Sequence, residues 1–255
     1  MIHNFTSDYW TDMTRKLPKI GKHGLENFLQ WDVVQKNMFM KNVTWANYEL
    51  KYLQSLSNWE TRWKPVLVES DIGNPIRHPH YKISSGNQIH MAYHIANFEN
   101  RSNRLIEDMD FIFEFGGGFG GLCKLIYDLG FKGKYIIYDL LKFNELQKYY
   151  LTHFDYIKKI QLLSKKDLYK LRDLKLKTNN LFIATWSLSE APIYIRNLIL
   201  NKVDKFNYYL ITYQDSFEEI NNIVYFNELK KEKVNINWDE WELHHIPKNY
   251  YLIGY

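Results

Sequence analysis

The sequence lacks several features that would point to particular classes of protein. With one cysteine, Cys123, it excludes a disulfide framework and a cysteine-based zinc site. It has no run of about 18 apolar residues, and its first residues lack the basic-then-apolar pattern of a signal peptide, so we expect no membrane span and a cytoplasmic protein. The net charge of +4 is small and its lysines are scattered, so we expect no nucleic-acid partner.

Glycine is also scarce, with 12 in 255 residues, yet five fall within six positions: Gly116, Gly117, Gly118, Gly120 and Gly121. They follow an apolar run at 111–115 that predicts a buried parallel strand. A turn without Cβ atoms lets the backbone approach a ligand closely, which indicates a nucleotide-like ligand. A helix is predicted at 122–129, and a second strand at 135–138 then delivers Asp139 about twenty residues beyond the glycines, where an acid can bind ribose hydroxyls.

The glycines fit two patterns. Gly116, Gly118 and Gly121 match the GxGxxG dinucleotide turn, and Gly116, Gly118 and Gly120 match the GxGxG turn of methyltransferases that use S-adenosylmethionine. Glu114 supplies the acid of the form ExGxGxG, and the unit begins only after a hundred residues of chain. We therefore favour a methyltransferase with S-adenosylmethionine as cofactor. An NAD-dependent oxidoreductase and a non-catalytic binding partner with the cofactor fold remain alternatives.

Four blocks carry a family resemblance: IGNP at 72–75, EFGGGFGGL at 114–122, KYIIYDL at 134–140 and ATWSLSEAP at 184–192. In these blocks the chain resembles the sugar O-methyltransferases found in bacterial surface-polysaccharide loci. The resemblance spans about residues 72–255 and departs at Leu141, where the family commonly has proline. It implies methylation of a sugar or of a sugar-linked phosphoryl or phosphoramidate group, in the synthesis of capsule or another surface polysaccharide, on a small-molecule or saccharide acceptor.

Residues beyond the carboxyl ends of the predicted strands are candidate site residues, because open α/β sheets bind ligands there. We expect cofactor contacts from Glu114, Gly116, Gly117, Gly118, Gly120, Asp139, Leu140, Ser164, Thr185 and Trp186. We expect substrate contacts from Arg77, His78, His80, Ser187 and Gln214. Glu190 is the expected general base, with His244 or His245 and then His78 or His80 as alternatives. The methyl donor is already electrophilic, so no metal is expected.

The N-terminal part predicts helices but no familiar motif. Helical spacing predicts one helix within 25–40 and a second capped by Thr44, whereas 1–22 shows no clear periodicity. The segment 71–88 holds two prolines and two glycines and is expected to be an irregular, functional loop. From Gln88 a further helix places His90 and His94 on one face. We interpret that pair as packing, because no acidic third metal ligand lies nearby in sequence.

The remaining strands are predicted at 159–163, 180–185 and 208–213, followed by a hairpin of 242–246 with 250–254. The sequence thus predicts an α/β fold with a Rossmann-like class I methyltransferase sheet, mostly parallel with a C-terminal antiparallel hairpin. We expect this sheet domain at 107–255 and an N-terminal helical annex, with a lid and substrate loop, at 1–106.

Overall fold

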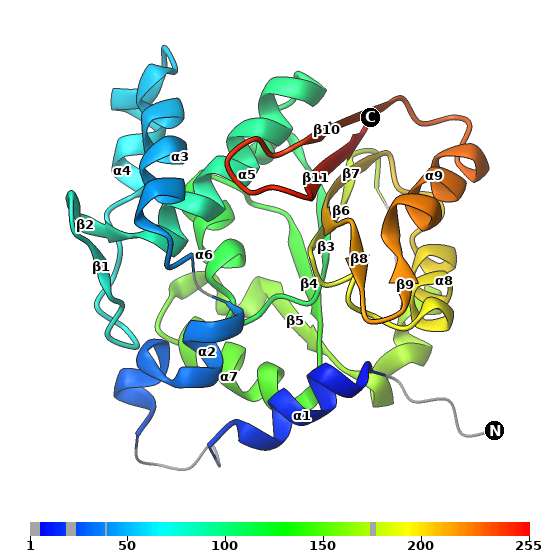
Figure 1. Ribbon diagram of the computed structural model, residues 1–255, viewed down its shortest axis with the longest axis horizontal. Coiled ribbons are helices and arrows are strands. Elements are labelled where there is room, and N and C mark those ends of the chain that lie inside the picture. Colours follow the sequence, from blue (N-terminus) through cyan, green and yellow to red (C-terminus); the bar gives the residue numbers. More distant parts are fainter. Residues whose placement is uncertain (1–5, 19–23, 39, 174–176) are drawn as a thin grey trace.

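The computed structural model describes residues 6–18, 24–38, 40–173 and 177–255 (Figure 1). Within these ranges the centre is a seven-stranded sheet with the order β10-β11-β7-β6-β3-β4-β5. The strands are β3 (Phe111–Phe115), β4 (Lys134–Tyr138), β5 (Ile160–Leu163), β6 (Asn180–Thr185), β7 (Tyr208–Gln214), β10 (Trp238–Glu242) and β11 (Asn249–Gly254). Strands β3 to β7 are parallel, and β11 lies antiparallel between β7 and β10. The predicted mostly parallel sheet with an antiparallel C-terminal hairpin is confirmed.

Helices cover both faces of the sheet (Figure 1). They are α5 (Gly86–Ser102), α6 (Gly121–Asp128) and α7 (Leu141–Leu151) on one face, and α8 (Ile193–Lys202) and α9 (Asn222–Glu232) on the other. Each strand sends alternate side chains to opposite sides, so Ile112 joins the first hydrophobic cluster while Phe111 and Phe113 join the second. All five residues of β3 are buried, as a strand covered on both faces requires.

The strand order fixes where a ligand site can form. From β3 the chain continues to β4 and β5 on one side of the sheet, and then crosses to β6 and β7 on the other side. The connections that leave β3 and β6 therefore diverge at the carboxyl ends of these two neighbouring strands. In open α/β sheets this divergence creates the crevice in which ligands bind.

Shorter elements precede the sheet: α1 (Asp8–Lys16), η1 (Leu25–Gln30), α2 (Asp32–Asn37), α3 (Val43–Ser55), η2 (Trp59–Trp63), α4 (Lys64–Val66), β1 (Arg77–His78), β2 (Tyr81–Ser85) and η3 (Ile106–Asp108). Later short elements are η4 (Asp155–Lys159), η5 (Lys165–Asp173), β8 (Ser216–Phe217) and β9 (Ile220–Asn221). Phe28, Leu53 and Trp63 belong to the same hydrophobic cluster as Ile112 and Leu125. The N-terminal segment therefore shares its core with the sheet.

Several N-terminal predictions were wrong in detail. The helix expected within 25–40 is interrupted at Trp31, whose extended backbone (φ −63°, ψ 136°) separates η1 from α2. Asn42, not Thr44, caps α3, because its side-chain oxygen accepts the first free backbone N–H groups. The region 1–22, expected to lack periodicity, contains α1 among its described residues.

The segment expected to be irregular at 71–88 is partly ordered. Strands β1 and β2 form a small antiparallel hairpin in which Arg77 pairs with Ser85. The hydroxyl of Ser85 also accepts the backbone N–H of Gln88, and α5 therefore begins at Gly86, two residues earlier than predicted. Backbone pairing across the hairpin gives an otherwise polar, proline-containing stretch a defined shape.

The first arm of the C-terminal hairpin was also misplaced. Strand β10 spans Trp238–Glu242, pairing Trp238 with Gly254 and Glu242 with Tyr250, and the predicted arm at 242–246 lies mostly in the connection to β11. Leu243 and Ile246 are buried there, so their apolar pattern resembled that of a strand. None of the helices in the described ranges combines the length and apolar content that crossing a membrane requires.

Candidate ligand-binding site

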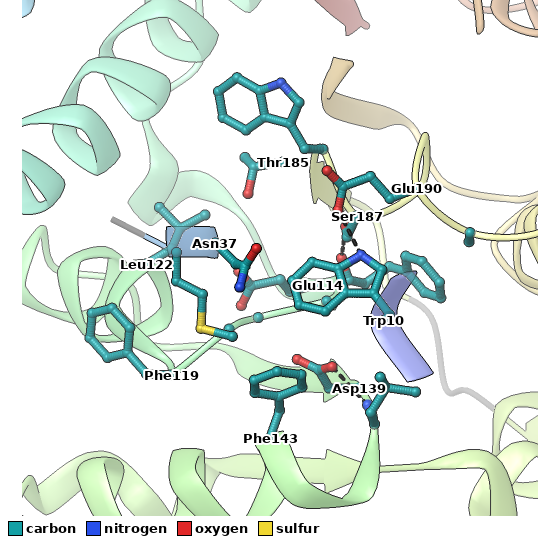
Figure 2. Close-up of a pocket in the computed structure, with 18 of the residues that line it drawn as sticks. Trp10, Asn37, Glu114, Phe119, Leu122, Asp139, Phe143, Thr185, Ser187 and Glu190 are labelled. Atoms are coloured by element: carbon teal, nitrogen blue, oxygen red, sulfur yellow. Dashed lines mark hydrogen bonds between the residues drawn. The ribbon is translucent and has the colours of Figure 1, made fainter. Parts of the chain in front are cut away.

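A cavity of about 1290 Å³ opens at the carboxyl ends of β3, β4 and β6 (Figure 2). Sites for one small ligand commonly measure about 300–1,000 Å³, so this cavity has room for two ligands. The loops after these strands form one wall, and α1, α2, α3 and α5 contribute the other. Of the predicted cofactor residues, these line it: Glu114, Gly116, Gly117, Gly118, Asp139, Leu140, Ser164, Thr185 and Trp186.

The glycine turn packs so closely against its neighbours that side chains would not fit at two of its positions. Gly116 has a left-handed backbone (φ 75°), and a Cβ there would overlap the side chain of Ser187. A Cβ on Gly117 would lie 2.6 Å from Cγ2 of Ile137. Gly120 does not line the cavity; it precedes α6 with φ 96° and packs against Leu151. Bare backbone therefore lets this turn, which we call the glycine cradle, pack against β4 and the loop after β6, and Gly120 shapes the start of the helix.

Asp139 stands at the end of β4 (Figure 2) and accepts hydrogen bonds from Leu140 and Gln147. Its Oδ1 accepts the backbone N–H of Leu140 at 2.7 Å, and its Oδ2 accepts Nε2 of Gln147 at 2.8 Å. Burial raises the pKa of Asp139 to about 7, although these hydrogen bonds favour the charged form. The backbone N–H groups of Gly117 and Gly118 also favour its charged form, so hydroxyl groups of a ligand would share the carboxylate with these donors. Sequence reasoning missed Gln147, because no motif marks its place on α7.

Glu114 is fully buried at the end of β3, directly beneath the glycine turn. The Tyr135 hydroxyl donates to its Oε2 at 2.9 Å, and its side chain is 1% exposed. Burial raises the pKa of Glu114 to about 8, so the group is largely protonated at neutral pH. A protonated carboxyl can donate a hydrogen bond as well as accept one, which suits a ligand that bears a negative group.

The residues at and after the end of β6 form the edge of the cavity opposite the glycine turn, and we call each of these two edges a lip. Trp186 has a left-handed backbone (φ 63°), which is unusual for a large side chain and is typical of functional sites. Its backbone N–H donates to the Thr212 carbonyl oxygen at 2.9 Å, and its indole Nε1 donates to Oδ1 of Asn249 at 2.6 Å. The Ser187 hydroxyl donates to the carbonyl oxygen of Phe115 and so joins this lip to the glycine turn. These contacts hold the indole in one orientation.

Glu190 lies on the same lip and is covered by α1 (Figure 2). Its Oε2 accepts the indole N–H of Trp10 at 2.8 Å, and Nε2 of Gln214 lies 3.5 Å from its Oε1. Burial raises the pKa of Glu190 to about 7, against the opposing effects of these donors and of Arg196. Trp10 also packs edge-on against Phe143, so it spans from one lip of the cavity to the other. Sequence reasoning missed Trp10, which lies 180 residues from Glu190.

The other predicted substrate and base residues lie elsewhere. Arg77 and His80 are outside the cavity, and Arg77 pairs with Glu69 and Asp71. His78 is buried within β1 and does not line the cavity. Gln214 touches Glu190 without lining the cavity. His244 is exposed in the connection between β10 and β11.

Two histidines interpreted as packing, His90 and His94, line the cavity. The His90 ring stacks on the Trp186 indole at a centroid distance of 5.3 Å. His94 shares a hydrogen bond with the Tyr251 hydroxyl, and burial holds its pKa well below the usual range. The sequence showed that His90 and His94 share one face of a helix, but it did not show that this face borders the cavity. In the described ranges, no three histidine, cysteine or acidic side chains are grouped as a metal site requires.

Comparison with known proteins identifies the fold. No family model and no curated protein sequence matches the chain. The methyltransferase domain of the bacterial protein CtHen1-CN is similar in structure with a TM-score of 0.50, at 10% identity over 66% of this chain and 98% of that one. An O-methyltransferase family protein from Burkholderia thailandensis gives a TM-score of 0.44, at 11% identity over 83% of this chain and 71% of that one. The first similarity, together with the strand order, shows that the chain has the class I methyltransferase fold.

Proposed function

We propose that this protein transfers a methyl group from S-adenosylmethionine to an oxygen of a small-molecule acceptor. The observation that carries the proposal is one continuous cavity that reaches from Asp139 to Glu190. We call the part lined by Glu114, the glycines 116–118 and Asp139 the cofactor half. The part lined by Trp10, His90 and Glu190 is the acceptor half.

The cofactor half has groups that suit the proposed cofactor. The glycine cradle places the backbone of residues 116–118 on the cavity wall, and the Asp139 carboxylate beside it is the proposed acceptor for the two ribose hydroxyls. Ser164 and Leu140, which follow β5 and β4, also line the cavity and would hold the adenine ring. Ser187 and Trp186 close the cradle from the side of β6.

The chemical step then needs little from the protein. S-adenosylmethionine, when bound, supplies a methyl carbon that is already electrophilic. The acceptor oxygen forms a bond to this carbon while the bond from carbon to sulfur breaks, and the hydroxyl proton passes to a base. Glu190 is the proposed base, because a carboxyl with a pKa near 7 is deprotonated often enough to take a proton and basic enough to hold it. Alignment of the acceptor supplies the rest of the acceleration.

We further propose that the acceptor is a sugar or a sugar-linked phosphoryl group. The resemblance in the blocks at 114–122, 134–140 and 184–192 supports this class. The acceptor half also presents the indole rings of Trp10 and Trp186, whose broad apolar faces suit the faces of sugar rings. The same resemblance supports a place in the synthesis of a bacterial surface polysaccharide.

A turnover assay tests this proposal. The protein is incubated with S-adenosylmethionine and a panel of methyl hexopyranosides, sugar phosphates and nucleotide sugars, and release of S-adenosylhomocysteine is measured with and without each acceptor. We expect acceptor-dependent release with at least one member. The Glu190→Gln protein, which keeps the shape of the site, serves as the inactive control. Release that never depends on an oxygen acceptor would reject the proposed reaction.

A further inference from the structure

A second cluster of titratable groups borders the acceptor half. Glu49 of α3 is fully buried, and its Oε1 lies 2.6 Å from Nδ1 of His90 on α5 and 2.8 Å from Nε2 of His245. His245 lies in the connection between β10 and β11 and stacks on Tyr48. Three segments that are far apart in the sequence thus meet at one carboxylate oxygen.

The two imidazoles keep Glu49 charged. Burial by itself would raise the pKa of this carboxyl, but attraction to a protonated His90 ring and hydrogen bonds from both rings outweigh it and lower the pKa below its usual value. A buried carboxylate can only accept hydrogen bonds, so each imidazole must present an N–H to it. For His90 that N–H is on Nδ1. In neutral His90 the other nitrogen, Nε2, is then an unprotonated hydrogen-bond acceptor.

His90 is placed to use that nitrogen in the cavity. Its ring lines the cavity wall and stacks on Trp186, whose own orientation is fixed by Asn249. Among the residues that the structure describes, the hydrogen bond of the His90 ring joins Nδ1 to Glu49, and none involves Nε2, although the His94 ring packs against it at a centroid distance of 4.2 Å. Nδ1 of His245 is buried without a hydrogen-bond partner, whereas Nε2 of His90 does not belong to this group of buried, unpaired atoms. An imidazole that is held by a buried carboxylate through one nitrogen, and whose ring lines a cavity, is a preorganised binding group.

We propose that His90 recognises the acceptor by taking a hydrogen bond, on Nε2, from a donor group other than the hydroxyl that is methylated. Glu49 is its positioning residue, because its charge selects the ring form with the proton on Nδ1. This inference rests on the proposed function. It adds that a productive acceptor presents two donors, one to Glu190 and one to His90. An acceptor without the second donor would leave Nε2 desolvated and unpaired, which the site should penalise strongly.

Two substitutions at position 90 separate the two ring nitrogens. In His90→Asn the short amide replaces Nδ1 and can still donate to Glu49, but nothing replaces Nε2. In His90→Gln the longer side chain can carry an oxygen close to the position of Nε2. We expect KM for the acceptor to rise about 10- to 100-fold in His90→Asn with kcat changed little, and a smaller rise in His90→Gln. Replacing the exposed His153 by Gln, outside the cavity, is the matched control.

The acceptors are methyl hexopyranosides and their monodeoxy forms, assayed by S-adenosylhomocysteine release. For wild type, removing one particular non-reacting hydroxyl should raise KM by about the same factor as His90→Asn, and the two changes together should add little. Equal loss from that deoxygenation in wild type and His90→Asn would overturn the inference while leaving the methyltransferase proposal intact. Failure of wild type on every glycoside, or failure to bind S-adenosylhomocysteine, would count against the proposed function instead.

The ring form of His90 is measured without any acceptor. Imidazole ¹H–¹⁵N spectra of the protein with S-adenosylhomocysteine, at about pH 8 where free imidazole is neutral, should show the His90 proton on Nδ1. In Glu49→Gln the charge that selects this form is gone, so the proton should distribute between both nitrogens. A wild-type proton on Nε2, or an unchanged distribution in Glu49→Gln, would overturn the assignment. Melting temperatures of both variants within a few degrees of wild type confirm that the comparison is made on folded protein.

Discussion

The two halves of the cavity are built in different ways. Glu114, the glycine turn and Asp139 come from one continuous stretch of 26 residues, 114–139, in which two parallel neighbouring strands carry the acids to the same edge of the sheet. Trp10, His90 and Glu190 come from α1, α5 and the loop after β6, and they meet only in the folded chain. One half is therefore encoded locally, and the other depends on long-range packing.

Two buried glutamates make the same contrast in chemical terms. Glu114 and Glu49 are both almost inaccessible to water, at 1% and 0% exposure. Burial raises the pKa of Glu114 to about 8, because its hydrogen-bond donor is the neutral Tyr135 hydroxyl. Two imidazoles instead lower the pKa of Glu49. The charge of a buried carboxyl in this protein is thus decided by its partners and not by its depth.

The largest effect is expected in the acceptor half. Glu190→Gln keeps the size of the side chain and can still accept the Trp10 N–H, but it removes the proposed base, so turnover should fall at least about 100-fold. Affinity for S-adenosylhomocysteine should stay within about 1 kcal/mol of wild type. Single-turnover methyl transfer and calorimetry measure the two quantities. Near-normal turnover would mean that another group, such as a cavity histidine, takes the proton.

The complementary change belongs to the cofactor half. Asp139→Ala removes the proposed partner of the ribose hydroxyls, so S-adenosylhomocysteine should bind about 1.5–3 kcal/mol more weakly. Calorimetric titration measures the loss, and Asp155→Ala, which removes an exposed carboxylate outside the cavity, is the control. If a folded Asp139→Ala protein bound S-adenosylhomocysteine with unchanged affinity, the ribose could not be bound by Asp139 at the end of β4.

A smaller effect is expected where α1 meets Glu190. The Trp10 N–H favours the charged form of Glu190, so Trp10→Phe should raise the pKa of this carboxyl further, by about one unit or less. Because the deprotonated form is the active one, turnover near pH 7 should fall several-fold and recover at higher pH. A pH–rate profile checks this shift, with Trp59→Phe, outside the cavity, as the control. A uniform loss at every pH would indicate that Trp10 contributes only packing.

The last prediction concerns stability and not binding or turnover. The raised pKa of Glu114 means that the folded state holds a proton which the unfolded state releases near pH 4.5, so this group lowers stability as pH rises from about 5 to 8. Glu114→Gln can still accept the Tyr135 hydroxyl but cannot ionise, so its free energy of unfolding should fall less over that range, by about 1 kcal/mol or more. Urea unfolding of both proteins at several pH values measures the difference. An identical pH dependence in the two proteins would show that Glu114 is charged when folded.

The same division explains what could be predicted from sequence. Strand 180–185, the sheet class and the cofactor-half residues followed from short-range patterns, because a buried parallel strand and a glycine turn leave local traces. The role of α1 could not be predicted from the sequence, because α1 is positioned by contacts of Trp10 with Glu190 and Phe143. Likewise, the i,i+4 spacing of His90 and His94 defined a face, but only tertiary packing turned that face toward the cavity.

The most direct test of the central claim is a pair of calorimetric titrations, with S-adenosylhomocysteine and with NAD. The glycine cradle and Asp139 predict that S-adenosylhomocysteine binds with a Kd of about 1 μM or lower and raises the melting temperature, and that NAD does neither. In Asp139→Ala the S-adenosylhomocysteine signal should weaken, while in Glu190→Gln it should persist. Protection by NAD without protection by S-adenosylhomocysteine would contradict the account.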